Sequence, residues 1–339
     1  MAATLGMLSP VNVLVTGATG FLGSWLCNSL TANGHHVTGT VRIQPAPGSL
    51  FHQLGLQERI HLLETNHLDV ARATEILDRV RPDVIFNLAG QSQIALSVSD
   101  PARTFHSNTY VGWALCEALR LAGRPIRMVQ VSSDAAYLSL AGGNPPDETS
   151  ALDCANVYEA SKAALDSLIV AYVKSYHLPL TIARLGNVYG PGDANRARLI
   201  PSILAAIAAN EGPLLRGGGR AVRSLLYVED AMRGLIALAV AANGFGRGEI
   251  FNLCGAPPRT VLEIARAVLA AAGARHLEPR VEDDGSGFTS VKISSSSKVQ
   301  RLLGWSPITL LDAGLAKTVD WDRTYRPIMN HAMESNAIA

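Results

Sequence analysis

A glycine-rich run near the amino terminus constrains the fold more than any other feature of the chain. The run from Gly17 to Gly23 follows the short apolar segment 11–16 and opens a segment, 21–33, whose apolar residues recur at helical spacing. A strand, a tight turn and a helix in this order are typical of the first unit of a dinucleotide-binding sheet. There the glycines let the backbone approach a pyrophosphate, and the helix N-terminus stabilises the anion. One more residue separates the first two glycines than in the common fingerprint, so the run is a variant of it.

Strand-like and helix-like segments alternate through the first two thirds of the chain. The apolar runs typical of strands lie at 11–16, 36–41, 60–64, 83–89, 126–132, 179–184 and 249–253. The amphipathic segments lie at 21–33, 70–80, 101–122, 153–177 and 228–242. This alternation predicts an α/β fold, a Rossmann-type doubly wound parallel sheet covered by helices on both faces.

The alternation breaks after residue 185, where glycine-rich and proline-rich segments separate shorter elements. We interpret this part as a smaller, discontinuous C-terminal lobe on the carboxyl edge of the sheet, where open α/β folds bind ligands. The predicted division has a dinucleotide-binding Rossmann domain at 1–186 plus about 224–255, a substrate lobe at about 187–223 plus 256–330, and a tail at 331–339.

Composition and charge argue against several classes of protein. A chain of 339 residues with 48% hydrophobic and 17% charged residues can bury a large core. The net charge of +1 gives no electrostatic reason to expect nucleic acid or an anionic membrane as partner. No apolar stretch is long enough to span a bilayer, and the first residues do not resemble a signal peptide, so we expect a cytoplasmic protein. The four cysteines are scattered and the nine histidines include no pair at ligand spacing, so we expect neither disulfides nor a metal site.

The second predicted strand ends at Arg42 rather than at a carboxylate. NAD sites usually place an acidic residue about 20 residues beyond the glycines, whereas an arginine there suits the 2′-phosphate of NADP. No acidic residue occurs between Leu22 and Gln57. Arg42 therefore predicts NADP as the cofactor. NAD remains the alternative, with Arg42 as a surface side chain and the ribose held by backbone groups.

A second group of residues carries the chemistry: Ser133 at a strand end, and Tyr158 and Lys162 within the segment 153–177. Hydride transfer at a carbon requires proton exchange at its oxygen. A tyrosine with a pKa of ~10 serves as the base only when a nearby cation stabilises its phenolate. Because Tyr158 and Lys162 are four residues apart on one helix face, we expect Lys162 to lower the pKa of Tyr158 and to bind the nicotinamide ribose. Ser133 is expected to bond the substrate oxygen, or else to cap a turn.

These motifs, with Asn87-Leu-Ala-Gly90 and Arg184-Leu-Gly-Asn-Val-Tyr-Gly-Pro191, resemble the extended short-chain dehydrogenase/reductase family of nucleotide-sugar epimerases, dehydratases and reductases. The resemblance covers about residues 11–325. For the cofactor, the resemblance implies that the pyrophosphate is held by Gly17, Gly20, Phe21, Leu22 and Gly23. It implies an adenine contact from Asp69. It also implies a loop that lines the cofactor, made of Leu88, Ala89 and Gly90. For the substrate, a nucleotide-diphosphate sugar, it implies the triad Ser133, Tyr158 and Lys162 and contacts from Asn187, Arg198, Leu199 and Arg223. From the residues alone, Arg223 could equally be a solvated surface arginine.

The two residues after Ser133 bear on the reaction. In relatives that remove water across C5 and C6 of the sugar, these positions usually supply an acid and a base, the base often glutamate. Here they are Asp134 and Ala135. Asp134 can act as the acid, but Ala135 cannot accept a proton, which disfavours the dehydratase reaction.

Several segments, among them 88–91 and 304–307, are most similar to reductases of GDP-4-keto-6-deoxymannose, whereas the loop 190–201 resembles CDP-glucose 4,6-dehydratases. The first hypothesis is therefore reduction of a 4-keto-6-deoxy nucleotide sugar at C4, with Tyr158 as general acid/base. A 4,6-dehydratase of the GDP-mannose or CDP-glucose type, a C4 epimerase, an enzyme acting on a non-sugar ketone or alcohol, and a non-catalytic cofactor-binding sensor remain alternatives. A homodimer packed through 101–122 and 153–177 is also expected from the resemblance.

Overall fold

The computed structural model describes residues 10–137, 143–241, 247–255, 257–283 and 290–337. Its centre is a seven-stranded sheet in the order β11-β6-β5-β4-β1-β2-β3, and every pairing in this sheet is parallel. The strands of the sheet are β1 (Asn12–Thr16), β2 (His36–Val41), β3 (His61–Glu64), β4 (Val84–Asn87), β5 (Arg127–Ser133), β6 (Leu180–Leu185) and β11 (Arg247–Leu253).

The sheet is wound in two directions from β1. The chain proceeds from β1 to β2 and β3 on one side, and then crosses to β4, β5 and β6 on the other. The direction reverses between β1 and β4, and open α/β sheets bind ligands at the carboxyl ends of the strands at such a point. The predicted doubly wound sheet is confirmed, and its strands lie close to the expected ranges because their Val- and Leu-rich runs are buried on both faces.

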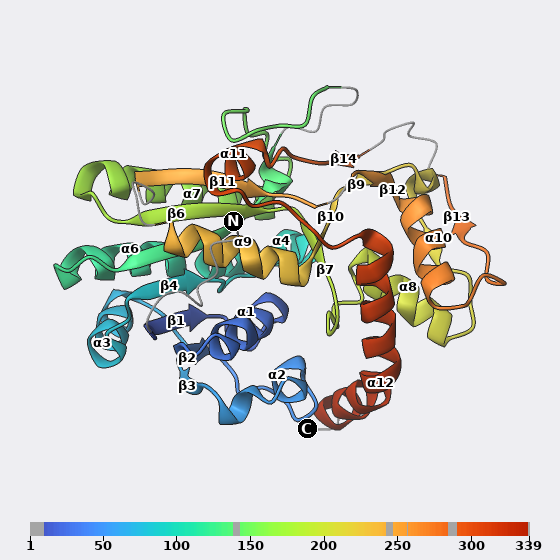
Figure 1. Ribbon diagram of the computed structural model, residues 1–339, viewed down its shortest axis with the longest axis horizontal. Coiled ribbons are helices and arrows are strands. Elements are labelled where there is room, and N and C mark those ends of the chain that lie inside the picture. Colours follow the sequence, from blue (N-terminus) through green and yellow to red (C-terminus); the bar gives the residue numbers. More distant parts are fainter. Residues whose placement is uncertain (1–9, 138–142, 242–246, 256, 284–289, 338–339) are drawn as a thin grey trace.

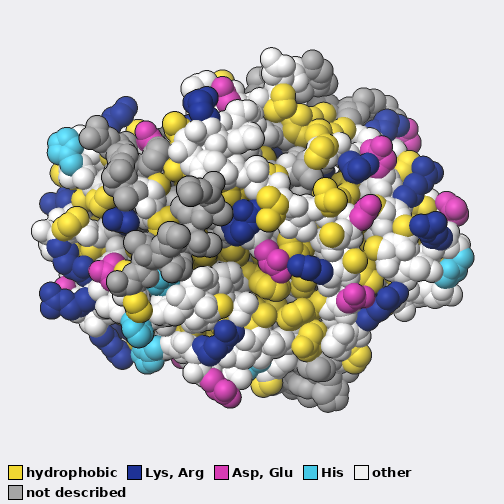
Figure 2. Space-filling view, viewed as in Figure 1, with side chains coloured by type: hydrophobic (Ala, Val, Ile, Leu, Met, Phe, Trp, Pro, Cys, Tyr) yellow, Lys and Arg dark blue, Asp and Glu magenta, His cyan; other side chains and the backbone are white. Residues whose placement is uncertain are grey.

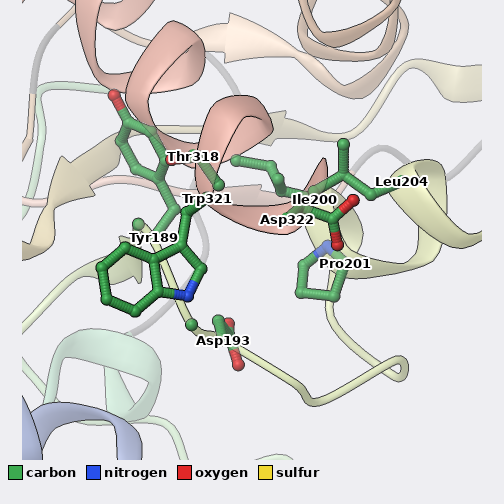
Figure 3. Close-up of a pocket in the computed structure, with 10 residues that line it drawn as sticks. Tyr189, Asp193, Ile200, Pro201, Leu204, Thr318, Trp321 and Asp322 are labelled. Atoms are coloured by element: carbon green, nitrogen blue, oxygen red, sulfur yellow. The ribbon is translucent and has the colours of Figure 1, made fainter. Parts of the chain in front are cut away.

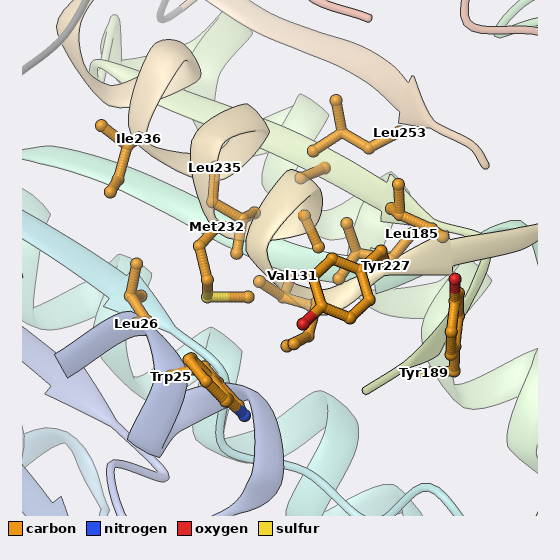
Figure 4. Close-up of a cluster of buried hydrophobic side chains, with 14 of the residues drawn as sticks. Trp25, Leu26, Val131, Leu185, Tyr189, Tyr227, Met232, Leu235, Ile236 and Leu253 are labelled. Carbon is orange, nitrogen blue, oxygen red and sulfur yellow. The ribbon is translucent and has the colours of Figure 1, made fainter. Parts of the chain in front are cut away.

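Helices cover both faces of the sheet (Figure 1). One face carries α1 (Phe21–Ala32) and α9 (Val228–Val240), and the other carries α3 (Val70–Val80), α6 (Val111–Ala122) and α7 (Val157–Tyr176). Figure 4 shows side chains of the first cluster, among them Trp25 and Leu26 of α1 and Met232 of α9. Leu26 is completely buried, and full burial of one such side chain stabilises the fold by about 1.5–3 kcal/mol.

The segment 101–122, expected as one helix, is divided into three parts. It contains α5 (Pro101–Phe105), a π-helical turn at His106–Tyr110, and α6. Asp100 caps α5 by accepting the backbone N–H of Arg103 at 2.9 Å, with proline in the first turn. The π turn directs Asn108, which is buried, toward the carboxyl edge of the sheet. Such turns are frequent at functional sites.

The remaining elements lie mostly outside the main sheet. They are α2 (Leu50–Gln53), α4 (Ile94–Ser99), β7 (Asn187–Tyr189), α8 (Leu199–Ala208), β8 (Leu214–Leu215), β9 (Val222–Arg223), β10 (Leu225–Tyr227), β12 (Arg259–Thr260), α10 (Val261–Ala271), β13 (Arg280–Val281), β14 (Val291–Lys292), α11 (Ser297–Leu303) and α12 (Leu311–Ala337). Small two- and three-stranded sheets join β7 with β10, β9 with β12 and β14, and β8 with β13. The arrangement supports a discontinuous second lobe, since α9 and β11 return to the main sheet between its parts. Residues 331–337, expected in a separate tail, continue α12.

Helix α12 connects the second lobe to the Rossmann sheet. The ring of Trp321 lies 6.0 Å from that of Trp25 in α1, and its Nε1 donates to Gln53 Oε1 at 2.9 Å.

Within the described part of the chain, none of the helices combines the length and apolarity that crossing a bilayer requires. Dark blue basic and magenta acidic side chains lie close together on the right of Figure 2, over the lobe that carries α10 and β13. Arg220 and Asp283 form an ion pair at 2.7 Å.

Candidate active site

The turn between β1 and α1 forms a backbone cradle. Gly17 has a φ of +67°, and a Cβ at Gly23 would lie only 2.0 Å from the carbonyl oxygen of Gly17. Gly20 is the N-cap of α1 and supplies no side chain to the first amides of the helix. A pyrophosphate can therefore approach these amides directly, and the positive end of the helix dipole favours it. The residues present fit the diphosphate of a nicotinamide dinucleotide.

A buried polar network fixes the neighbouring loop, which contains Leu88, Ala89 and Gly90. The hydroxyl of Thr16 donates to Asn87 Oδ1 at 2.5 Å and accepts the backbone N–H of Ala89 at 3.1 Å. Asn87 in turn donates to Gln130 on β5 at 2.6 Å. A Cβ at Gly17 would be 3.1 Å from the backbone nitrogen of Ala89, so the two loops lie in contact. The network spans β1, β4 and β5.

Ser133, Tyr158 and Lys162 come together at the carboxyl edge of the sheet. Ser133 ends β5, and its side chain lies within hydrogen-bonding range of the Tyr158 hydroxyl in the first turn of α7. Lys162, one turn later, is buried, and its Nζ donates to the carbonyl of Val131 at 3.4 Å. The same Nζ lies 3.3 Å from the Cβ position of Gly90, which brings the lysine to the cofactor loop.

The pKa of Tyr158 is shifted in the direction opposite to the expected one. Burial of the phenol raises this pKa, while the hydrogen bond with Ser133 and the charge of Arg198 act in the opposite direction. Desolvation disfavours the phenolate and is the largest influence on this pKa in the folded chain. Lys162 is itself desolvated, and burial lowers its pKa to about 8.

Asn108 is a site residue that sequence reasoning missed. Its Oδ1 accepts the backbone N–H of Gln91 at 2.7 Å, and its Nδ2 donates to Ser161 Oγ at 2.9 Å. The amide thus joins the loop after β4 to the helix that carries Lys162. The residue lies inside a segment expected as regular helix, where nothing in the apolar spacing marks an inward-facing amide.

Asp134 is buried beside the triad, and two residues of the second lobe reach its loop. Ser294 Oγ donates to Asp134 Oδ2 at 2.7 Å, and Lys292 Nζ donates to the carbonyl of Ala135 at 2.8 Å. Burial raises the pKa of Asp134 to about 6, although the Ser294 bond and the charges of Lys292 and Arg223 favour its ionised form. A cavity of about 10 Å³ lies beside Asp134 and Lys292.

This raised pKa predicts a pH-dependent effect of Asp134→Asn on stability. The folded state holds the proton of Asp134 up to about pH 6, whereas the unfolded chain releases it near pH 4. Ionisation therefore destabilises the native protein as the pH rises from 4 to 6, by about 3 kcal/mol for a shift of this size. We expect Asp134→Asn to be more stable than wild type at pH 7 and equally stable at pH 4, as measured by urea unfolding. An equal difference at both pH values would contradict the assignment.

The four residues implied in substrate binding lie on three segments of the second lobe. Arg198 precedes α8, donates to Ser92 Oγ at 3.0 Å and lies 5.9 Å from the ring of Phe21, beside the glycine turn. Leu199 is the first residue of α8. Arg223 is half-buried, donates to the carbonyl of Ser290 at 2.9 Å, and its charge acts on Asp134. Asn187 is exposed at the start of β7.

Arg42 and Asp69 follow the carboxyl ends of β2 and β3 in the main sheet. Arg42 is exposed directly after β2. Asp69 is exposed and serves as the N-cap of α3, accepting the backbone N–H of Arg72 at 2.8 Å. One of its carboxylate oxygens is thus used by the fold, and the adenine contact expected of it stays a prediction.

A second cavity lies away from the triad, between α8, α12 and the loop 190–193 (Figure 3). Its volume of about 20 Å³ holds one water and excludes a nucleotide. Tyr189, Trp321 and Asp193 are among its lining residues, and none of the triad lines it. It is therefore a small gap within the second lobe, and the triad lies elsewhere.

Comparisons with known proteins point to one family. A family model described as "NAD dependent epimerase/dehydratase family" matches residues 13–254. UDP-glucose 4-epimerase of Mycolicibacterium smegmatis is 29% identical over 315 residues, which cover 92% of this chain and 99% of that protein. The structure of dTDP-glucose 4,6-dehydratase from Streptomyces venezuelae with NAD bound has a TM-score of 0.82 at 28% identity and covers 93% of this chain and 98% of its own. UDP-glucose 4-epimerase of Thermotoga maritima with UDP-glucose also has a TM-score of 0.82, at 26% identity, and covers 92% and 99%.

Proposed function

The chain belongs to the NAD-dependent epimerase/dehydratase family, and from this premise we propose that it transfers hydride at C4 of a nucleotide-linked hexose without eliminating water. The assembly of Ser133, Tyr158 and Lys162 beside the glycine cradle carries the proposal. The first candidate reaction is reduction of a 4-keto-6-deoxy nucleotide sugar. The second is C4 epimerisation, favoured by the near full-length similarity to a UDP-glucose 4-epimerase.

The residues of the site divide the work as follows. The nicotinamide ring, when bound, supplies or accepts the hydride. Tyr158 exchanges the proton with the C4 oxygen, and Ser133 bonds that oxygen and the phenol. Lys162 stabilises the phenolate by its charge. Arg223 and Asn187 contact the diphosphate of the substrate, and Arg198 and Leu199 lie in the loop over its nucleotide.

Ala135 argues against the dehydratase alternative. The position after the acid usually supplies the base for the C5 proton in relatives that eliminate water, and the methyl group of Ala135 offers none, so elimination would need a base from elsewhere. Lys292 contacts this position, but its Nζ donates to the carbonyl of Ala135 at 2.8 Å and to Glu159 Oε1 at 3.2 Å. An ammonium engaged as a donor in both bonds does not serve as a base.

A substrate panel with a cofactor readout tests the proposal. Purified protein is incubated with UDP-glucose, dTDP-glucose, GDP-mannose and CDP-glucose, and with the matching 4-keto-6-deoxy sugars, each with and without NADPH or NADH. Oxidation of one reduced cofactor per sugar supports the reductase, and C4 inversion without net cofactor change supports the epimerase. Formation of a 4-keto-6-deoxy sugar from the unmodified hexose would show that elimination occurs. Cofactor binding with every sugar inert would leave the non-catalytic sensor.

Arg42 supports NADP as the preferred cofactor, whereas the family as such is NAD dependent. If the exposed guanidinium binds the 2′-phosphate, Arg42→Asp removes charge-assisted hydrogen bonds worth about 1.5–3 kcal/mol. We expect NADPH affinity to fall by about 10-fold or more relative to NADH affinity, measured by fluorescence titration. Arg301→Asp on α11 is the matched control, since it makes the same charge change on an exposed arginine elsewhere. An unchanged NADPH-to-NADH ratio in Arg42→Asp would show that the phosphate is bound elsewhere.

A homodimer is proposed through the outer faces of α6 and α7. Exposed apolar side chains lie on these two helices and on the elements packed against α7, namely Val98, Phe105, Tyr110, Leu121 and Tyr176. We expect a particle of twice the 35.9 kDa chain mass by light scattering. Leu121→Asp should convert it to monomer, and Ile308→Asp, on an exposed apolar residue before α12, should not. A monomeric wild type would exclude this interface.

A further inference from the structure

A buried ion pair between Asp166 and Arg184 lies one helical turn from Lys162. Arg184 on β6 donates through Nε to Asp166 Oδ2 on α7 at 2.8 Å, and each side chain is only 4% exposed. The other side of the guanidinium is held by Tyr137, whose hydroxyl accepts from Nη1 at 2.7 Å and whose ring lies 4.9 Å from the guanidinium carbon. The pair is therefore fixed by β6, α7 and the loop after Ser133.

Stability does not explain this pair well. Two charges lose their hydration on burial, and a buried ion pair is often no more stabilising than apolar residues of the same volume. Oδ1 of Asp166 moreover has no well-aligned hydrogen-bond partner among the described residues. A carboxylate retained in such surroundings points to a role for its charge.

The position of Asp166 indicates what that role is. Asp166 follows Lys162 by four residues on α7, so the two side chains are neighbours on one helix face. Lys162 has one protein acceptor, the carbonyl of Val131 at 3.4 Å, among the hydrogen bonds of the described residues. From this alternation of a cation, an anion and a cation we propose that Asp166 is a positioning residue that keeps Lys162 protonated, and that Arg184 keeps Asp166 ionised.

The titration behaviour of the three groups supports this order. Burial lowers the pKa of Lys162 to about 8, and the charge of Asp166 acts against that shift. Burial also raises the pKa of Asp166, while Arg184, the Ser132 hydroxyl and Lys162 favour its ionised form. The other titratable groups that face the pair are Tyr137 and Cys154.

The inference rests on the function proposed for Lys162, because only a protonated lysine stabilises the Tyr158 phenolate. Without Asp166, Lys162 would lose its proton within the neutral range and the phenol would be harder to ionise. Among the described residues, Asp166 is paired with Arg184 and not with the phenol or the glycine cradle, so its effect on the phenol is transmitted through Lys162.

Lysine NMR tests the proposal without any substrate. The chain has five lysines, Lys162, Lys174, Lys292, Lys298 and Lys317, so a protein labelled at lysine gives few side-chain signals. Lys162→Met identifies the signal of interest. We expect Lys162 to titrate near pH 8 in the wild type, and about one pH unit lower or more in Asp166→Asn. Asp166→Glu, which keeps the charge, should restore most of the shift.

Two further variants separate this effect from a general loss of structure. Asp230→Asn removes another buried carboxylate, one paired with Arg233 at 2.6 Å, and should leave the Lys162 titration unchanged. If Asp166→Asn does not fold because Arg184 is left unpaired, the double variant Asp166→Asn/Arg184→Met removes both charges and should show the same lowered titration. An unchanged Lys162 titration in whichever of these variants folds overturns the proposal, even if the enzyme proves active. Inactivity toward every sugar would instead count against the proposed function alone.

Discussion

Tyr158→Phe is expected to reduce turnover by about 100-fold or more while cofactor affinity stays near that of the wild type. The substitution removes the hydroxyl that exchanges a proton with the substrate, and loss of a general acid/base typically costs about 100- to 10,000-fold. The ring remains in place in the first turn of α7, and the glycine cradle on α1 is untouched. The measurement is kcat with the active sugar, together with cofactor titration by fluorescence.

Tyr176→Phe on the same helix provides the control. Tyr176 is 50% exposed and lies more than four helical turns beyond Tyr158, so its hydroxyl has no access to the site. We expect this variant to keep wild-type kcat. Full activity in Tyr158→Phe would remove the proton-transfer role and with it the proposed chemistry.

Gly23→Ala is expected to produce the second large effect, a loss of cofactor affinity by about 10-fold or more. Alanine in a helix normally gains up to about 1 kcal/mol over glycine. Here the new Cβ would lie 2.0 Å from the carbonyl oxygen of Gly17 and 2.9 Å from the backbone of Ala18, so the turn must move. Overpacking of this kind costs about 1–3 kcal/mol, which outweighs the gain, and the movement displaces the amides that face the pyrophosphate.

The test combines cofactor titration with urea unfolding, and the control lies at the other end of α1. Gly34 has a φ of +82° with no atom within 4 Å of its Cβ position, and asparagine tolerates that conformation. Gly34→Asn should therefore bind cofactor like the wild type. A Gly23→Ala protein with normal stability and normal NAD(H) affinity would show that the turn can relax and that the contact between α1 and the loop is not required.

The strands and the triad could be predicted from sequence because each leaves a local signature. Continuous Val- and Leu-rich runs mark strands buried on both faces, and the interval of four between Tyr158 and Lys162 is visible within one helix. The π turn at His106–Tyr110 left no such mark, because helical periodicity over a long segment is insensitive to one wider turn. Asn108 was missed for that reason.

Other parts of the site depend on contacts between distant residues. Ser294 reaches Asp134 across 160 positions of sequence, and no local pattern predicts that bond. The predicted direction of the shift in the Tyr158 pKa is wrong, because tertiary packing decides how much of the phenol is removed from water. Asp166 is an intermediate case: its distance of four residues from Lys162 was legible, but its pairing with Arg184 was not.

The contacts from Ser294 and Lys292 to the loop after Ser133 have a consequence for how such enzymes diversify. Part of the electrostatic setting of Asp134 is supplied by the C-terminal lobe, so a chimera that joined this Rossmann domain to the lobe of a relative would exchange more than sugar recognition. The pKa of Asp134 would also differ in such a chimera. The acidity of Asp134 and the choice of substrate are therefore expected to change together when lobes are swapped, and only transplants that carry the 291–296 segment together with the 133–135 loop should preserve that acidity.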